Sequence, residues 1–130
     1  MPIARITLAK GKSAEYLAAI SKSVYDAMRE AFLLEEGDLF HIFEQPDMNA
    51  FIYDRHFNSA DPRTDDFMII NILSDARRKE HKIATFKAIC EKLGSSPGVK
   101  PQDIVVTFST NNTLEDFSLG YGISVDDMLG

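Results

Sequence analysis

The sequence predicts an α+β fold in which one strand–helix–strand unit occurs twice. Strand-like and helix-like stretches follow one another in the same order in both halves of the chain. The halves also align without a gap, because Leu8 matches Leu73 and Phe43 matches Phe108 at a constant offset of 65 residues. A duplicated βαβ unit predicts a four-stranded sheet with two helices on one face.

The first unit, residues 2–47, begins with a strand over residues 3–9 and continues into an amphipathic helix. Ser13 is well suited to cap the start of this helix, because its hydroxyl can accept a hydrogen bond from a free backbone amide. The stretch LFHIF at 39–43 is aromatic and β-branched, which favours a second strand. Apolar residues recur in the helix at spacings of three and four, as expected for one buried face: they are Leu17, Ile20, Val24, Met28 and Phe32.

The second unit, residues 67–112, repeats this order. FMIINIL at 67–73 predicts a strand, SDAR at 74–77 a turn, and IVVTF at 104–108 the last strand. The helix between them is expected to bury one apolar face, formed by Ile83, Phe86, Ile89 and Leu93. The loop-like stretch between the units contains FIY at 51–53, which could form a further short strand.

The 130 residues are expected to form one domain with a C-terminal tail over residues 113–130. The tail is interrupted by glycines and predicts a turn with a short β-ribbon. A net charge of −6 argues against nucleic acid as a partner. No segment is apolar over the ~20 residues that a membrane helix needs. The start lacks the pattern of a secretory signal, and the single Cys90 cannot form an internal disulfide, so we expect a cytoplasmic protein.

One face of the predicted sheet has no helix to cover it. Two crossover helices cover a single face, yet FMIINIL and IVVTF are almost continuously apolar, as in strands that are covered on both sides. The tail offers no third helix long enough to close the gap. We therefore expect several copies of the chain to associate through their sheets with closed cyclic symmetry.

The first residues of the two units indicate a candidate site. Pro2 directly precedes the first strand. Parallel strands of a βαβ unit begin at the same end of the sheet, so Asp38, which precedes the second strand, is expected beside Pro2. If the first strands of the two units lie side by side in opposite directions, the residues from Leu73 to Arg77 also come toward Pro2.

The chemistry of this site depends on a free amine at Pro2. Removal of Met1 is expected because the next residue is small, and it exposes a secondary amine. An α-amino group has a pKa of about 7.7 to 8.0, and an apolar pocket or a nearby guanidinium lowers it. A neutral amine can take a proton from carbon beside a carbonyl. Arg77 would hold a substrate carboxylate through two hydrogen bonds and stabilise the enolate.

Structural explanations of the same residues remain open. Proline is tolerated at the start of a strand without any catalytic meaning. Asp38 has a counterpart, Asp103, in the unit where Phe67 replaces Pro2, so a shared turn or capping role would explain both acids. The three histidines show no metal-ligand spacing, and we expect neither a metal ion nor an organic cofactor.

Together these features resemble the tautomerase superfamily, whose members reuse βαβ units and act through an N-terminal proline. The similarity is to the double-length, tautomerase-like group that includes malonate semialdehyde decarboxylase. It rests on MPIARITL, EEGDLFHIFEQP, TDDFMIINILSDARRKEHK, KPQDIVVTF and EDFSLGYG, and so spans nearly the whole chain. The resemblance implies a tautomerase/MIF-like fold and a homotrimer.

The resemblance also assigns roles to residues. It gives carboxylate binding to Arg77, and it gives Asp38 the position of an acid that orients or activates water. The tail reads DFSLG where the group has a DWSFG-like motif, so Phe117 and Leu119 are expected to line the pocket. Asp75 stands where the decarboxylase pattern has an arginine.

The expected function is that of a tautomerase, an isomerase in which Pro2 moves a proton on a small 2-keto or 3-oxo carboxylate held by Arg77. One alternative is a lyase, a decarboxylase or hydratase of the malonate semialdehyde decarboxylase type, with a protonated Pro2 as general acid and Asp38 orienting water. The other alternative is a non-catalytic, oligomeric ferredoxin-like binding module.

Overall fold

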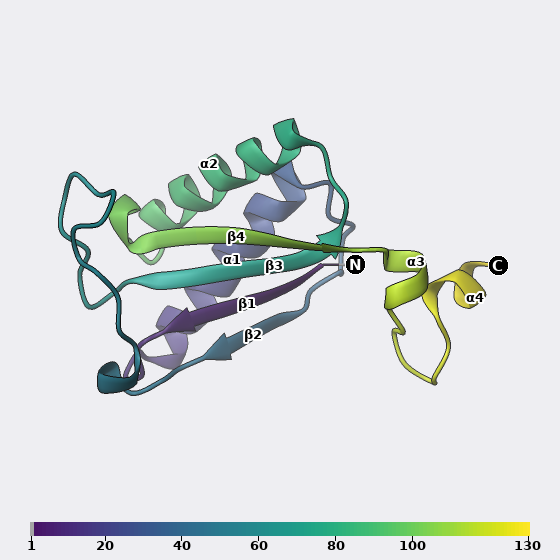
Figure 1. Cartoon of the computed structure of the whole chain (residues 1–130), viewed down its shortest axis with the longest axis horizontal. Helices are drawn as coiled ribbons and strands as arrows, with labels where there is room; N and C mark the ends of the chain where they lie inside the picture. Colours follow the sequence, from purple (N-terminus) through teal and green to yellow (C-terminus); the bar gives the residue numbers. More distant parts are fainter. Residues whose placement is uncertain (1) are drawn as a thin grey trace.

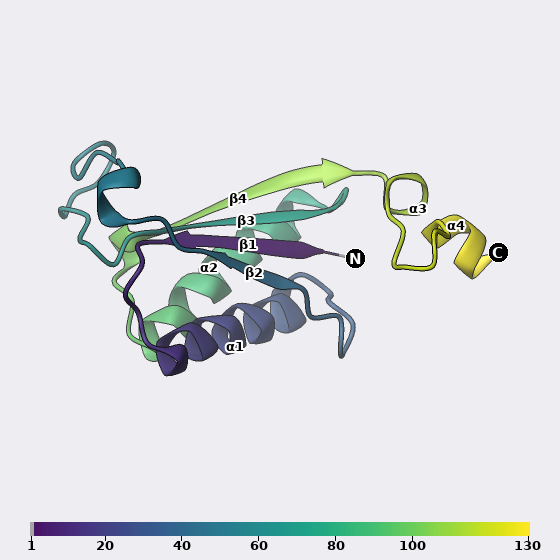
Figure 2. The ribbon, with the colours of Figure 1, turned by 90° about the horizontal axis from the view of Figure 1, so that it is seen from below.

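The computed structural model describes residues 2–130, and Met1 lies outside the described residues. Four strands form one mixed sheet in the order β2-β1-β3-β4, and two long helices lie side by side on one of its faces (Figures 1 and 2). The strands are β1 (Ile3–Leu8), β2 (His41–Glu44), β3 (Met68–Asp75) and β4 (Ile104–Asn111), and the helices are α1 (Ala14–Ala31) and α2 (Lys79–Ser95). The predicted α+β fold of two βαβ units is confirmed.

The two units meet through their first strands. β1 pairs with β2 and β3 with β4 in parallel, whereas β1 and β3 pair antiparallel in the middle of the sheet. Ile3 lies opposite Leu73, and Ala4 lies opposite His41. The start of β1 is therefore next to both the start of β2 and the end of β3, as expected from first strands lying side by side.

Helix α1 follows the sequence pattern closely. The Ser13 side-chain oxygen accepts a hydrogen bond from the Tyr16 amide at 3.1 Å, so Ser13 caps the helix as predicted. Four of the five expected core residues are fully or almost fully buried, and Leu17 packs against them in part. These four are Ile20, Val24, Met28 and Phe32.

Helix α2 buries a different face from the one predicted. Ile89 and Leu93 are buried as expected, but Ile83 and Phe86 remain 42% and 40% exposed, while Thr85 is fully buried. Thr85 can be buried because its hydroxyl donates to the backbone carbonyl one turn earlier in the helix, at 2.7 Å. Phe86 lies at the margin of the core, where its ring contacts an aromatic ring of the edge strand β4 at a centroid distance of 5.2 Å.

Strands β2, β3 and β4 begin or end at different residues from those predicted. The turn predicted at 74–77 begins later, because Ser74 and Asp75 still pair with Thr110 and Asn111 of β4. β4 accordingly continues beyond the predicted end at residue 108. β2 begins two residues later than predicted, at His41, and residues 51–53 form no strand but follow a short 3-10 helix, η1 (Met48–Ala50).

The tail extends beyond the end of the sheet at which β1 begins (Figures 1 and 2). It contains two short helices, α3 (Thr113–Asp116) and α4 (Val125–Leu129). The predicted β-ribbon is reduced to a single bridge between Ser118 and Ser124. None of the helices in residues 2–130 is long and apolar enough to cross a membrane.

Asp103 fastens the loop between the two units to the sheet. It is completely buried at the end of a short 3-10 helix, η2 (Pro101–Asp103), directly before β4. One carboxylate oxygen accepts from the Thr64 amide at 2.7 Å, and the other accepts from the Thr64 hydroxyl at 2.5 Å. The hydroxyl of Tyr53 donates to the Thr64 carbonyl at 2.5 Å, so Thr64 is held on both sides.

We expect Asp103→Ala to lower the free energy of unfolding by about 1 to 3 kcal/mol, because it leaves two partly buried donors of Thr64 without their acceptor. Asp103→Asn keeps one acceptor and should lose less. Urea unfolding followed by circular dichroism measures both changes. Equal stability of Asp103→Ala and the unchanged protein would contradict this role.

Candidate active site

A cavity of about 400 Å³ lies at the end of the sheet where β1 begins. Its walls come from the segment after α1, the end of β3 and the tail. The apolar part of the wall consists of Leu33, Leu34, Leu114, Leu119, Val125 and Leu129. The polar part consists of Glu35, Asp38, Asp75, Arg77 and Thr113.

Pro2 is buried next to this cavity wall. The pairing of Ile3 with Leu73 places Pro2 beside Ser74, one residue from Asp75. On the other side, the Ala4 amide donates to the carbonyl of residue 40 at 3.0 Å, so the segment that includes Asp38 runs past Pro2. The fold thus brings the first residue of one unit together with the two flanking segments that the sequence predicted.

Arg77 is held in place before any ligand arrives. Only 17% of its side chain is exposed, and its Nε donates to Asp75 Oδ1 at 2.9 Å. Its Nη1 donates to the backbone carbonyl of Phe32, and its guanidinium lies 4.5 Å from the centroid of the Phe32 ring. Nη2 forms no hydrogen bond with any residue in the described range 2–130. A carboxylate in the cavity could be bound through this nitrogen.

Asp38 and its counterpart Asp103 have different surroundings. Both oxygens of Asp103 accept hydrogen bonds from Thr64, whereas Asp38 Oδ1 is buried without a partner among residues 2–130. Burial raises the pKa of Asp38, the charge of Glu35 acts in the same direction, and the charge of Arg77 opposes both. A capping role common to both acids, which the sequence left open, is therefore not what the contacts show.

The two tail residues predicted for the pocket are placed differently. Leu119 lines the cavity. Phe117 is half-buried within the tail, where its carbonyl accepts from the Val125 amide at 3.0 Å, and in the single chain it is not part of the cavity wall. Sequence patterns did not indicate Thr113 or the leucines after α1, because α3 is a single short turn and the segment after α1 is irregular, so neither has a hydrophobic period.

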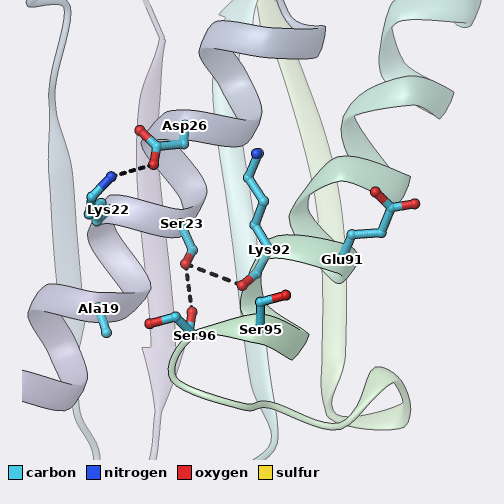
Figure 3. Close-up of a pocket in the computed structure, with 8 residues that line it drawn as sticks. All are labelled: Ala19, Lys22, Ser23, Asp26, Glu91, Lys92, Ser95 and Ser96. Carbon is cyan, nitrogen blue, oxygen red and sulfur yellow. Dashed lines mark hydrogen bonds and ion pairs between the residues drawn. The ribbon is translucent and has the colours of Figure 1, made fainter.

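A second cavity, of about 430 Å³, lies between α1 and α2 (Figure 3). Three of its polar side chains, Lys22, Ser23 and Asp26, are engaged with other atoms of the cavity wall. Lys22 pairs with Asp26 at 2.6 Å, and the Ser23 hydroxyl donates to the Ser96 carbonyl at 2.5 Å and more weakly to the Lys92 carbonyl at 3.4 Å. These contacts tie the end of α2 to α1, which is a structural role.

The chain is similar to known enzymes over most of its length. A sequence model of the family described as "Tautomerase enzyme" matches residues 38–120. "Probable tautomerase YusQ" of Bacillus subtilis (strain 168) is 30% identical over 123 residues, covering 94% of this chain and 95% of that protein. "Probable tautomerase YrdN" of the same strain is 27% identical over 94% of this chain and 93% of that protein. The chain belongs to the tautomerase enzyme family.

Several solved structures are similar to this chain. A crystal structure of FG41 malonate semialdehyde decarboxylase inhibited by 3-bromopropiolate is 29% identical, with a TM-score of 0.84 over 93% of this chain and 91% of that one. Another malonate semialdehyde decarboxylase superimposes with a TM-score of 0.89 at 18% identity, over 98% and 96% of the two chains. A fused 4-OT, described as a symmetric trimer, gives 0.77 at 16% identity, over 97% and 98%. The last two likenesses concern the fold alone, and the resemblance seen in the sequence is confirmed.

The raised pKa of Asp38 predicts how its replacement depends on pH. A carboxyl whose pKa is higher in the folded than in the unfolded chain stabilises the fold below its unfolded-state pKa, and this contribution is lost as the pH rises through the folded-state value. Asp38→Asn cannot ionise. We therefore expect the variant to gain stability relative to the unchanged protein as the pH rises above about 3.9, the ordinary pKa of an aspartate.

Urea unfolding at a series of pH values, with Asp103→Asn as the matched control, measures this difference. Asp103 accepts two hydrogen bonds, so its replacement should cost stability at neutral pH. A stability difference for Asp38→Asn that stays constant across the series would show that burial does not disfavour its charge.

Proposed function

We propose that this protein is a tautomerase that interconverts the keto and enol forms of a small 2-keto or 3-oxo carboxylate. The observation that carries the proposal is the restrained guanidinium of Arg77, which lines a partly apolar cavity beside β1, the strand that directly follows Pro2. The 29% identical malonate semialdehyde decarboxylase supports a carboxylate as the ligand. Tautomerisation itself needs only a base, a proton donor and stabilisation of the enolate.

The proposed step is a proton transfer through Pro2. After removal of Met1, the neutral nitrogen of Pro2 takes a proton from the carbon next to the substrate carbonyl. The electron pair of that C–H bond forms the C=C bond of the enolate, and the carbonyl oxygen takes the negative charge, which Arg77 stabilises. The prolinium then returns its proton to the oxygen, which completes the enol, and the reverse sequence restores the ketone.

The apolar wall supports this assignment of the base. Burial disfavours a charged ammonium group, so a buried amine is neutral at lower pH than an exposed one. Leu119 contributes to this wall, and we assign the same role to Phe117 once the tail is packed against a neighbouring copy.

We propose that the active form is a homotrimer. The sheet carries both helices on one face (Figure 2). Several large apolar side chains of the tail are exposed to solvent in the single chain. Burial of such side chains against another copy is favourable. The fused 4-OT of similar fold is described as a symmetric trimer. The exposed tail residues are Leu114, Leu119, Tyr121, Ile123, Met128 and Leu129.

A decarboxylase or hydratase activity is the second candidate, and Asp38 favours it. Its buried Oδ1 has no partner within residues 2–130 and could accept a hydrogen bond from a water molecule. In this mechanism a protonated Pro2 donates a proton, and Asp38 orients the water that adds to the substrate.

Replacing Arg77 tests carboxylate binding. We expect Arg77→Ala to lower kcat/KM on a 2-keto acid by about 100-fold, because charge-assisted hydrogen bonds to the substrate are lost. Arg78→Ala is the matched control, since it removes the same charge from the neighbouring residue, which is exposed. Equal losses in the two variants would mean that only the general field of positive charge matters.

The pH dependence of kcat/KM separates the two mechanisms. A base must be neutral, so a tautomerase should lose activity as the pH falls through the pKa of Pro2, whereas a general acid must be protonated and should lose activity at high pH. Intact-mass measurement establishes that Met1 is absent from the sample. Full turnover by protein that retains Met1 would rule out both roles for Pro2, and so would a Pro2→Ala variant with unchanged turnover. A binding module would give no turnover in any form.

A further inference from the structure

A neighbouring cavity adjoins the candidate active site. It has a volume of about 410 Å³ and is lined by Asp75, Ala76 and residues 111–114. It shares Asp75, Thr113 and Leu114 with the cavity that contains Arg77, so these three residues form a wall common to both. A ligand bound to Arg77 at one end could therefore place its other end against the residues of this neighbouring cavity.

Two polar atoms in this region are buried and have no hydrogen-bond partner among residues 2–130. They are the side-chain oxygens of Asn111 and Thr113. Leaving such an atom unpaired costs about 1 to 3 kcal/mol, so a ligand that supplies the missing partner is favoured.

The turn between β4 and α3 explains why these side chains lack partners. The side chain of Asn112 accepts from the Leu114 amide at 3.2 Å, and the carboxylate of Asp116 accepts from the Asn112 amide at 2.9 Å. These contacts cap α3 and use the nearby backbone donors. The side chains of Asn111 and Thr113, on either side of Asn112, therefore line the neighbouring cavity.

Negatively charged side chains outnumber positively charged ones in the walls of the two cavities. The carboxylates of Glu35, Asp38 and Asp75 line the first cavity together with one cation, Arg77. Asp75 already occupies one nitrogen of that cation. The combined site can therefore hold one substrate carboxylate, at Arg77, but it would repel a second one near Asp75.

We infer that the substrate is a keto monocarboxylate with a hydroxyl group at the end remote from Arg77, and that Asn111 and Thr113 bind this hydroxyl. A hydroxyl can donate to the Asn111 oxygen and accept from the Thr113 hydroxyl, so one group satisfies both unpaired atoms. A terminal methyl would satisfy neither. This inference rests on the proposed function, because it specifies the substrate of the same site.

Three acids with the same six-carbon chain test the inference: 2-oxohexanoate, 6-hydroxy-2-oxohexanoate and 2-oxoadipate. Exchange of the protons beside the carbonyl for deuterium, followed by NMR, gives kcat/KM for each acid. We expect the hydroxy acid to exceed 2-oxohexanoate by about tenfold and 2-oxoadipate to be the poorest of the three.

Two variants assign the preference to residues. Thr113→Val and Asn111→Leu should each reduce the ratio between the hydroxy acid and 2-oxohexanoate to near one. Thr107→Val removes a hydroxyl from the exposed part of the same strand and should retain the preference. Thermal unfolding identifies any variant that fails to fold. If one of the two variants does not fold, the substrate preferences of the unchanged protein and of the other variant test the inference.

The outcomes separate the two proposals. Exchange at equal rates, or a preference for 2-oxoadipate, would overturn the inference and leave the tautomerase assignment intact. A preference that both variants retain would also overturn it. Lack of exchange with all three acids would overturn the tautomerase assignment, and the inference with it.

Discussion

The antiparallel pairing of β1 with β3 is the constraint on which the candidate site depends. It joins two units that are each internally parallel, so the beginning of the first unit meets the end of the third strand. Pro2 and Arg77, far apart in the chain, come to the same end of the sheet for this reason alone. A slip of one residue in this pairing would turn every side chain of β1 to the opposite face and remove its core residues from the interior. The core therefore keeps the register that the site needs.

Duplication gives the fold two equivalent ends, and the end where β1 begins is open to the cavity that contains Arg77. At the end where Phe67 stands in place of Pro2, the loop between the units packs aromatic rings together: the ring centroids of Tyr53 and Phe67 are 4.4 Å apart, and those of Phe51 and Phe67 are 5.7 Å apart. Asp103 at that end has its hydrogen bonds satisfied, whereas Asp38 at the open end does not. Asp103 thus stabilises the loop between the units, whereas its counterpart Asp38 lines a cavity.

The sequence predicts what depends on local periodicity and on repetition, and much less of what depends on neighbouring chain segments. The α1 core and the Ser13 cap follow from side-chain spacing, and the order of the strands follows from the repeat. The burial of Thr85 depends on a hydrogen bond within the helix, which no hydrophobic pattern reveals. Likewise, Asp75 continues β3 only because β4 extends far enough to pair with it, and the tail takes its place without any regular period.

The contacts of Arg77 determine how selective the site can be. A guanidinium fixed by Asp75 and by the carbonyl and ring of Phe32 presents its remaining nitrogen in one direction, so a ligand loses little additional freedom of the protein when it binds. The same ion pair takes up part of the positive charge, and further carboxylates surround it. Attraction at a single point combined with repulsion around it favours ligands with one carboxylate over ligands with two. If Arg77 binds the substrate carboxylate as we propose, the charge balance of the cavity selects substrates as much by exclusion as by binding.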